Sequence, residues 1–196
     1  MKTKIAIAGW PKSNKTMLAL ALSNMTGIPY IQNRTMYEWR KIHDLTDSPN
    51  PEWKDMYLIA SSSFFERALM ESYYEQFISD GASFSELMWL KFCLEERQPG
   101  KIQFDRNKTT ESLEHVCALH AAQQYDFIIH AVSGDSPCIN DLYGQLYAKY
   151  HLTYRMYSTE IIEETVNEIK NDLHLPVKHS VESAIYQAKV DLFLKP

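Results

Sequence analysis

Short apolar runs separate longer stretches of helical spacing along most of this chain. Five runs bounded by turn residues predict buried strands, at residues 3–8, 28–31, 77–79, 125–132 and 153–157. The stretches between and after them predict helices, at residues 16–25, 52–74, 83–97, 110–124, 138–150, 162–173 and 181–192. The chain therefore alternates strand and helix up to residue 157 and ends in two amphipathic helices.

Turn and capping residues mark several of these boundaries. The first helix is rich in Leu, Ala and Met, and Gly27 is placed to end it. Ser83 and Glu86 have the spacing of a capping box at the start of a later helix. We expect the serines at 61–63 to break the helix over 52–74, and residues 33–50 to form turns.

The alternation of strands and helices is typical of a parallel sheet covered by helices on both faces. The predicted fold class is therefore α/β with three layers. A chain of 196 residues suits a single domain over 1–196, with a small lid or insertion around 97–112, where Gln98, Pro99 and Gly100 interrupt the pattern. Ligands of such folds bind beyond the carboxyl ends of the strands.

Charge and cysteine content narrow the functional classes. The formal net charge is −5 and no basic run is present, which argues against nucleic-acid binding as the main function. The three cysteines are widely spaced without a CxxC pair, as is typical of a reducing compartment. No apolar run approaches the ~20 residues of a membrane span. We therefore expect no membrane partner and a cytoplasmic location.

The residues between the first strand and the first helix nearly match a phosphate-binding motif. Residues 9–16 (Gly-Trp-Pro-Lys-Ser-Asn-Lys-Thr) fit the Walker A pattern G-x-x-x-x-G-K-[ST] except at Asn14, where the pattern has glycine. Backbone N–H groups and the helix N-terminus attract phosphate. Lys15 would reach the β- and γ-phosphates of ATP, and the Thr16 hydroxyl would bind Mg²⁺. The expected nucleotide-binding residues are Gly9, Pro11, Lys12, Ser13, Asn14, Lys15 and Thr16.

The asparagine in this motif is compatible with a working loop. Asparagine is among the few residues that enter the left-handed backbone region in which glycine is favoured. Two other interpretations stay open. One is a plain strand–turn–helix junction that carries Lys15 and Thr16 by chance, and the other is a P-loop fold whose site has decayed.

The order of strand, loop, Leu/Ala-rich helix and Gly-Ile-Pro is similar to that of small P-loop kinases that act on nucleosides, nucleotides and related metabolites. The chain resembles the ribosylnicotinamide-kinase-like ATPases over residues 5–31, 75–90 and 125–157. The resemblance implies a three-layer P-loop NTPase fold, with ATP and Mg²⁺ as cofactors. It also implies phosphoryl transfer to a small acceptor of the nucleoside or nucleotide class.

The same resemblance implies an acceptor site. Asp80, at the end of the strand over 77–79, would position Mg²⁺ or accept the proton of the attacking hydroxyl, and would be catalytic together with Lys15. Arg34, which follows the strand over 28–31, would bind the acceptor. A turn residue in an Asp-Gly pair and a loop cation are the alternative interpretations of Asp80 and Arg34.

One departure from the kinase pattern leaves two functional hypotheses. Such kinases carry lid arginines after the strand that corresponds to 125–132, whereas residues 133–150 contain none. Lys101, Arg106 and Arg155 are the candidates to replace them. The chain is then either an ATP-dependent kinase for a small metabolite, or a nucleotide-binding regulatory or switch protein with little turnover. The apolar C-terminal helices offer a surface for a homodimer.

Overall fold

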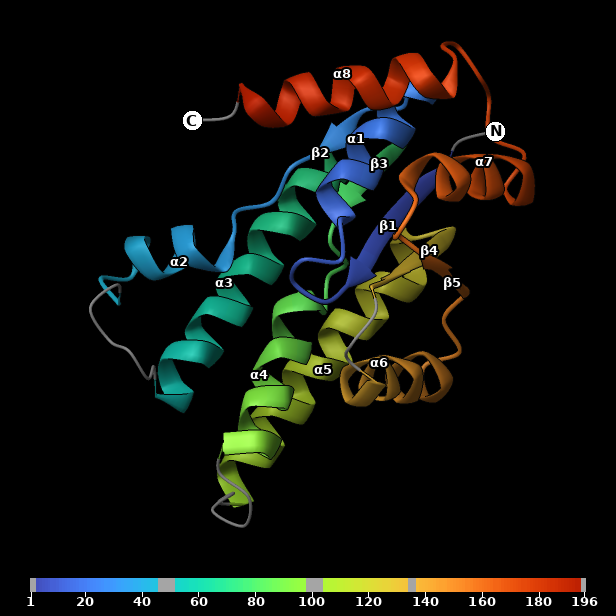
Figure 1. Cartoon of the computed structure of the whole chain (residues 1–196). Coiled ribbons are helices and arrows are strands. Elements are labelled where there is room, and N and C mark those ends of the chain that lie inside the picture. Colours follow the sequence, from blue (N-terminus) through green and yellow to red (C-terminus); the bar gives the residue numbers. More distant parts are fainter. Residues whose placement is uncertain (1–2, 46–51, 98–103, 134–136, 195–196) are drawn as a thin grey trace.

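A parallel sheet lies at the centre of the molecule (Figure 1). The computed structural model describes residues 3–45, 52–97, 104–133 and 137–194. Within these residues five strands pair in the order β2-β3-β1-β4-β5, and every pair is parallel. The strands are β1 (Lys4–Gly9), β2 (Tyr30–Ile31), β3 (Phe77–Asp80), β4 (Phe127–Val132) and β5 (Tyr154–Ser158).

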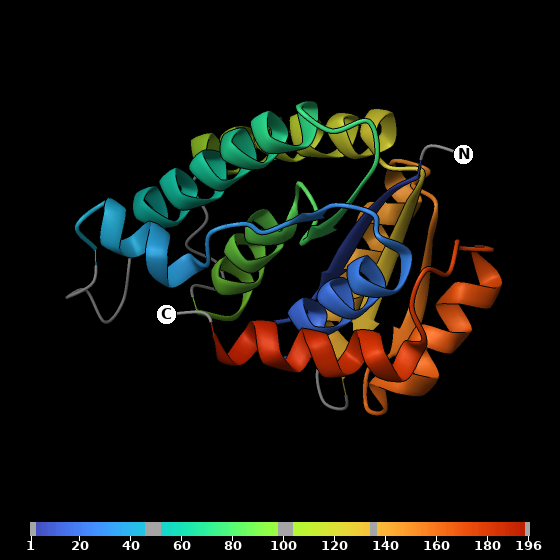
Figure 2. The same ribbon diagram turned by 90° about the horizontal axis from the view of Figure 1, so that it is seen from above.

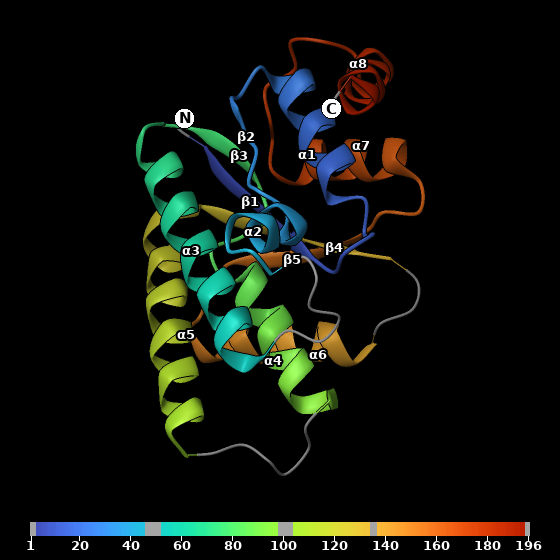
Figure 3. The same cartoon turned by 90° about the vertical axis from the view of Figure 1, so that its left-hand side faces the viewer.

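Helices cover both faces of the sheet, which confirms the three-layer α/β prediction (Figures 2 and 3). One face carries α1 (Lys15–Thr26), α7 (Ile162–Asp172) and α8 (Val181–Phe193). The other carries α3 (Trp53–Ser72), α4 (Ser85–Arg97), α5 (Phe104–Gln124) and α6 (Pro137–Lys149). The short helix α2 (Met36–Ile42) follows β2 and lies beside α3.

The first strand shows why its apolar run is continuous. Side chains alternate between the two faces of a strand. Ile5 and Ile7 belong to the core layer that contains α1, whereas Ala6 and Ala8 belong to the layer that contains α3–α6. All four are completely buried. A parallel strand with helices on both sides therefore needs apolar residues at every position.

The strand order puts the loop after β1 at a special place in the sheet. From β1 the chain first builds β2 and β3 on one side, and then β4 and β5 on the other. The carboxyl end of β1 is thus the point where the direction of winding changes. Open α/β sheets bind ligands at this switch point, so the topology places residues 9–16 where a ligand is expected.

Three local predictions were wrong. Helix α3 is continuous through the serines at 61–63, because the helix buries Ile59, Ala60 and Phe64 on either side of them, and this packing outweighs the weak helix preference of serine. Helix α4 begins at Ser85, and the Ser83 hydroxyl donates instead to the Cys117 carbonyl of α5. The turns expected over 33–50 include helix α2.

A visible sequence signal could have found α2. Thr35 and Glu38 form a capping box, in which the Thr35 hydroxyl accepts from the Glu38 N–H and the Glu38 carboxylate accepts from the Thr35 N–H.

The expected lid region over 97–112 falls partly on α5, which already begins at Phe104, while residues 98–103 lie outside the described residues.

The two C-terminal helices pack within the chain. Val166 and Ile169 of α7, and Ala184 and Ala188 of α8, are buried in the same core cluster as the residues of α1. Part of each apolar stripe is therefore covered by the protein itself, whereas Ile162, Ile185 and Leu192 are only partly buried; the homodimer stays a prediction. In the part of the chain that the structure describes, no helix has the length and apolar character needed to cross a bilayer.

A buried glutamate joins three helices on the opposite face. Glu114 of α5 accepts from Lys91 of α4 at 2.5 Å and from Lys149 of α6 at 2.7 Å. Its side chain is only 3% exposed. Burial disfavours the carboxylate, but the bonds from the two lysines outweigh burial and lower the pKa of Glu114 below its ordinary value of 4.5.

This arrangement predicts a pH-dependent part of the stability. Because the folded-state pKa is lowered, the stabilisation is complete above the unfolded-state pKa of about 4.3 and is lost as the pH falls through the folded value. We expect Glu114→Gln to lower the free energy of unfolding by about 2 kcal/mol at pH 7 and by much less at pH 3. Urea unfolding at both pH values measures this. Glu111→Gln, on the exposed face of the same helix, is the control, and equal losses at the two pH values would contradict the assignment.

Candidate functional site

The loop between β1 and α1 contains three residues with positive φ. Gly9, Lys12 and Asn14 have φ values of +140°, +73° and +54°. A Cβ atom on Gly9 would lie 2.4 Å from the Ala131 carbonyl oxygen, so this position accepts only glycine. Asn14 adopts the left-handed backbone conformation, as expected for a residue that replaces the glycine of the Walker A pattern.

Two side chains of this loop have unusual surroundings. The Asn14 side-chain amide donates to the Thr159 carbonyl at 3.1 Å, across the end of β5. Ser13 is buried, and its hydroxyl has no hydrogen-bond partner among the described residues. Buried polar atoms are normally satisfied. An unsatisfied hydroxyl in this loop is therefore consistent with a site that receives a polar ligand.

Lys15 begins α1 and holds its ammonium over the loop. Its Nζ atom donates to the Trp10 carbonyl at 2.7 Å. Burial lowers the pKa of Lys15, and the carboxylates of Asp80 and Glu86 oppose this effect. A phosphate oxygen could replace the Trp10 carbonyl as the acceptor of this hydrogen bond, since ammonium groups bind anionic oxygen more strongly than neutral oxygen.

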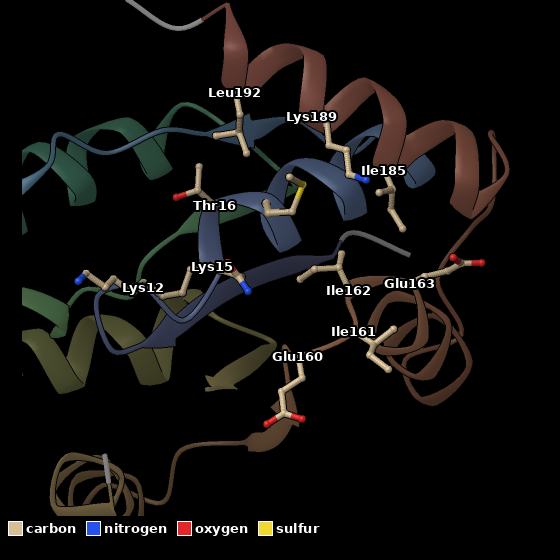
Figure 4. A pocket seen from close by; sticks show the side chains of 12 residues that line it. Lys12, Lys15, Thr16, Glu160, Ile161, Ile162, Glu163, Ile185, Lys189 and Leu192 are labelled. Carbon is tan, nitrogen blue, oxygen red and sulfur yellow. The ribbon is translucent and has the colours of Figure 1, made fainter. Parts of the chain in front are cut away.

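The loop separates two cavities. The first has a volume of about 640 Å³ and lies between the loop, the segment 160–163 and helix α8 (Figure 4). The second has a volume of about 490 Å³ and lies on the side of β3 and α3. Lys15 and Thr16 line both cavities.

The first cavity combines the loop with an apolar and charged wall. Lys12, Asn14 and Thr16 supply its loop side. Figure 4 shows the α8 side chains on one flank and those of residues 160–163 on the other. The remaining lining residues are Met17, Glu160, Ile161, Ile162, Glu163, Ile185, Lys189 and Leu192.

The second cavity contains the predicted acceptor residues. Asp80 lies at the end of β3, and its carboxylate accepts from the Tyr30 hydroxyl at 3.0 Å. Its backbone carbonyl accepts from the side chains of Asn33 at 3.0 Å and Arg67 at 3.2 Å. Pro11 also lines this cavity. Three side chains, those of Tyr30, Asn33 and Arg67, therefore fix Asp80 in the cavity that Lys15 also lines.

Arg34 lines the same cavity but is already engaged. It forms an ion pair with Glu66 of α3, and its guanidinium lies 5.3 Å from the centre of the Trp39 ring. Its side chain is 48% exposed. The structure therefore places Arg34 in the same cavity as Asp80, with a partner that a ligand would have to displace or share.

A second arginine in this cavity was missed from the sequence. Arg67 of α3 has a side chain only 1% exposed and lies 3.4 Å from the Glu86 carboxylate. Gly81 has a φ of +111°, and a Cβ atom there would lie 2.5 Å from the Arg67 guanidinium. The Nε atom of Arg67 has no hydrogen-bond partner among the described residues. The signal was present, because the spacing from Ala60 and Phe64 puts position 67 on the buried face of α3.

An aromatic wall completes the second cavity. The rings of Trp10 and Trp89 lie 4.7 Å apart, and Phe92 packs 5.0 Å from Trp10. Tyr37, which is 69% exposed, and Tyr143 also line the cavity. Aromatic faces of this kind bind planar rings. By contrast, Trp39 is buried and stacks on His43, and Trp53 stacks on Tyr57.

The donor set in the second cavity fits a hard divalent cation. Mg²⁺ takes oxygen ligands and usually keeps water and phosphate oxygens beside one or two protein groups. The Thr16 hydroxyl and the Asp80 carboxylate line the same cavity and are both oxygen donors. These two residues would hold Mg²⁺, which neutralises phosphate charge when it is bound.

Of the three residues expected to replace the lid arginines, Arg155 lies away from both cavities. Arg155 pairs with Glu168 at 3.3 Å and with Asp172 at 2.7 Å, and it lines neither cavity. Lys101 and the side chain of Arg106 lie outside the described residues. Helix α6, which follows β4, packs Tyr143, Leu146 and Tyr147 into the core.

Comparison with known proteins shows the fold. No family model matches the chain, and no curated protein matches it. A deoxyadenosine kinase from M. mycoides, solved with bound dATP, aligns with a TM-score of 0.64 and 16% identity, over 88% of this chain and 100% of its own. The structure of that kinase with dCMP and a flexible dCDP gives 0.63 and 18%, over 88% and 98%. The chain therefore has a P-loop kinase-like fold.

Proposed function

We propose that the chain binds ATP with Mg²⁺ on residues 9–16 and transfers the γ-phosphoryl group to a hydroxyl of a small acceptor of the nucleoside or nucleotide class. The observation that carries this proposal is that Lys15 and Thr16 line both cavities. A triphosphate that enters along the first cavity would end at the boundary with the second. Catalysis of phosphoryl transfer depends mainly on such positioning and on charge stabilisation.

The residues of the second cavity support an acceptor with a planar ring. Trp10 and Trp89 offer aromatic faces, and the Arg67–Glu86 pair offers both a donor and an acceptor of hydrogen bonds. Asp80 would accept the proton of the attacking hydroxyl or hold Mg²⁺. The structural neighbour from M. mycoides is a kinase for a deoxynucleoside, which agrees with this acceptor class.

The test is a direct transfer assay. The protein is incubated with Mg²⁺ and ATP labelled in the γ-phosphate, together with single ribonucleosides, deoxynucleosides, their monophosphates and nicotinamide riboside. We expect label to move to one class of acceptor, and calorimetry to show ATP binding that needs Mg²⁺. ATP binding without transfer to any acceptor would contradict the kinase proposal, and absence of ATP binding at millimolar concentration would remove the nucleotide site as well.

A second candidate function is nucleotide binding with little turnover. It is favoured by the pairing of both cavity arginines, Arg34 with Glu66 and Arg67 with Glu86. Neither guanidinium is then free to stabilise charge on a transferring phosphoryl group. The same assay separates the two functions, because this candidate predicts ATP binding with transfer no faster than spontaneous hydrolysis.

A further inference from the structure

The asparagine that replaces the motif glycine makes a contact that glycine could not make. Its side-chain amide reaches the Thr159 carbonyl at 3.1 Å, from a position 145 residues earlier in the chain. Thr159 is completely buried. Its N–H and its hydroxyl both donate to the Val132 carbonyl, at 3.0 Å and 3.1 Å. The acceptor of the Asn14 bond is therefore fixed to the ends of β4 and β5.

The contact joins the two sides of the first cavity. Asn14 belongs to the loop that would hold phosphates. Thr159 directly precedes residues 160–163, which line the cavity on the flank that faces α8. A ligand with its phosphates on the loop and a ring system farther along the cavity would touch both the loop and residues 160–163. The bond between Asn14 and Thr159 sets the distance and orientation between these two parts of one site.

We propose that Asn14 is a positioning residue that fixes the phosphate loop against the segment 160–163, so that the phosphate and base parts of a nucleotide are bound together. The inference rests on the proposed function, because it requires a nucleotide on residues 9–16. It goes beyond that function in assigning a purpose to the departure from the motif. With asparagine at position 14, the loop is linked to the segment that would contact the base. A glycine there would give only backbone freedom.

The chemistry of the position suits asparagine. The backbone at residue 14 has a φ of +54°, which favours glycine, asparagine and aspartate. Only asparagine among these three carries a side-chain donor for a carbonyl. Aspartate would also place a negative charge beside the phosphates. Glycine keeps the backbone geometry and removes only the link, so Asn14→Gly is the cleanest deletion of this contact.

The test compares two ligands on one variant. Calorimetry measures the affinity of wild-type protein and Asn14→Gly for Mg²⁺-ATP and for Mg²⁺-tripolyphosphate, which has no base. We expect the variant to bind ATP about fivefold more weakly, as for the loss of one hydrogen bond. Its affinity for tripolyphosphate should stay within about twofold, because the phosphate loop is intact.

A matched control uses another left-handed residue of the same loop. Lys12 has a φ of +73°, so Lys12→Gly adds similar backbone freedom but leaves the Asn14 bond in place. Loss of this cation should weaken the binding of ATP and tripolyphosphate by similar factors. Thermal unfolding of each variant verifies that it is folded.

Several results would overturn the proposal. Stronger or unchanged ATP binding by Asn14→Gly would show that the link has no role. Equal losses with both ligands would show that Asn14 serves only the phosphate loop. Failure of the wild-type protein to bind either ligand would instead refute the proposed function, and the role of Asn14 with it.

Discussion

Replacement of Lys15 by alanine is expected to lower the affinity for Mg²⁺-ATP by at least about 100-fold and to remove phosphoryl transfer. The Lys15 side chain is half-buried, donates to the Trp10 carbonyl in the loop over residues 9–16 and lines both cavities. A cation that is shielded from water interacts strongly with phosphate oxygens, and loss of one preorganised group of this kind costs about 100- to 1000-fold in rate. Calorimetry and the labelled-ATP assay measure the two effects.

The matched control for this prediction is Lys12→Ala. Lys12 lies three residues earlier in the same loop but is exposed to solvent and lines only the first cavity. An exposed cation is screened, so we expect less than about a tenfold loss of ATP affinity. Similar losses for the two lysines would mean that the loop attracts phosphate by its overall charge. The assignment of Lys15 to the γ-phosphate would then be wrong.

The second large effect concerns stability. Glu86→Gln is expected to lower the free energy of unfolding by about 3 kcal/mol, because it leaves the guanidinium of Arg67 buried without its nearest carboxylate. Burial disfavours the charged form of Arg67, and the surrounding carboxylates, Glu86 foremost, outweigh it and raise the pKa of Arg67. Arginine is effectively always protonated in proteins, so Arg67 stays charged when Glu86 is replaced. Urea unfolding at pH 7 measures the loss.

A second ion pair on α3 gives the control. Arg34 and Glu66 have side chains that are 48% and 23% exposed, so Glu66→Gln should cost at most about 1 kcal/mol. The double variant Arg67→Met with Glu86→Gln should regain at least half of the stability lost by Glu86→Gln alone, since it removes the stranded charge. If the double variant is no more stable than Glu86→Gln, loss of packing explains the effect.

The elements that could be predicted from the sequence share a local signal. β1 and β4 are mostly apolar runs, and α1 ends just before Gly27, which has a φ of +71°. Residues 9–16 form the expected loop between β1 and α1, and Asn14 has the left-handed backbone that its place in the motif suggests; phosphate binding by this loop stays a prediction. Each of these signals lies within a few residues of the chain, where steric and hydrogen-bonding preferences act directly.

The features that escaped prediction depend on distant contacts. Arg67 enters the second cavity because α3 packs against α4, and because Gly81 leaves space for its guanidinium. The partner of Asn14, Thr159, directly follows β5, which is brought near only by the order of strands in the sheet. The continuous course of α3 depends on the burial of its apolar face against the rest of the protein, which local composition does not reveal.

The shared boundary between the two cavities has a thermodynamic consequence. Lys15 and Thr16 border both of them, so a ligand on one side changes the charge and the geometry that a ligand on the other side meets. The two binding equilibria are then linked, and each ligand must change the affinity of the other by the same factor. A molecule that joins a donor and an acceptor through one polyphosphate chain would occupy both cavities at once. Its second half would bind at a high effective concentration, and its affinity would exceed that of either half.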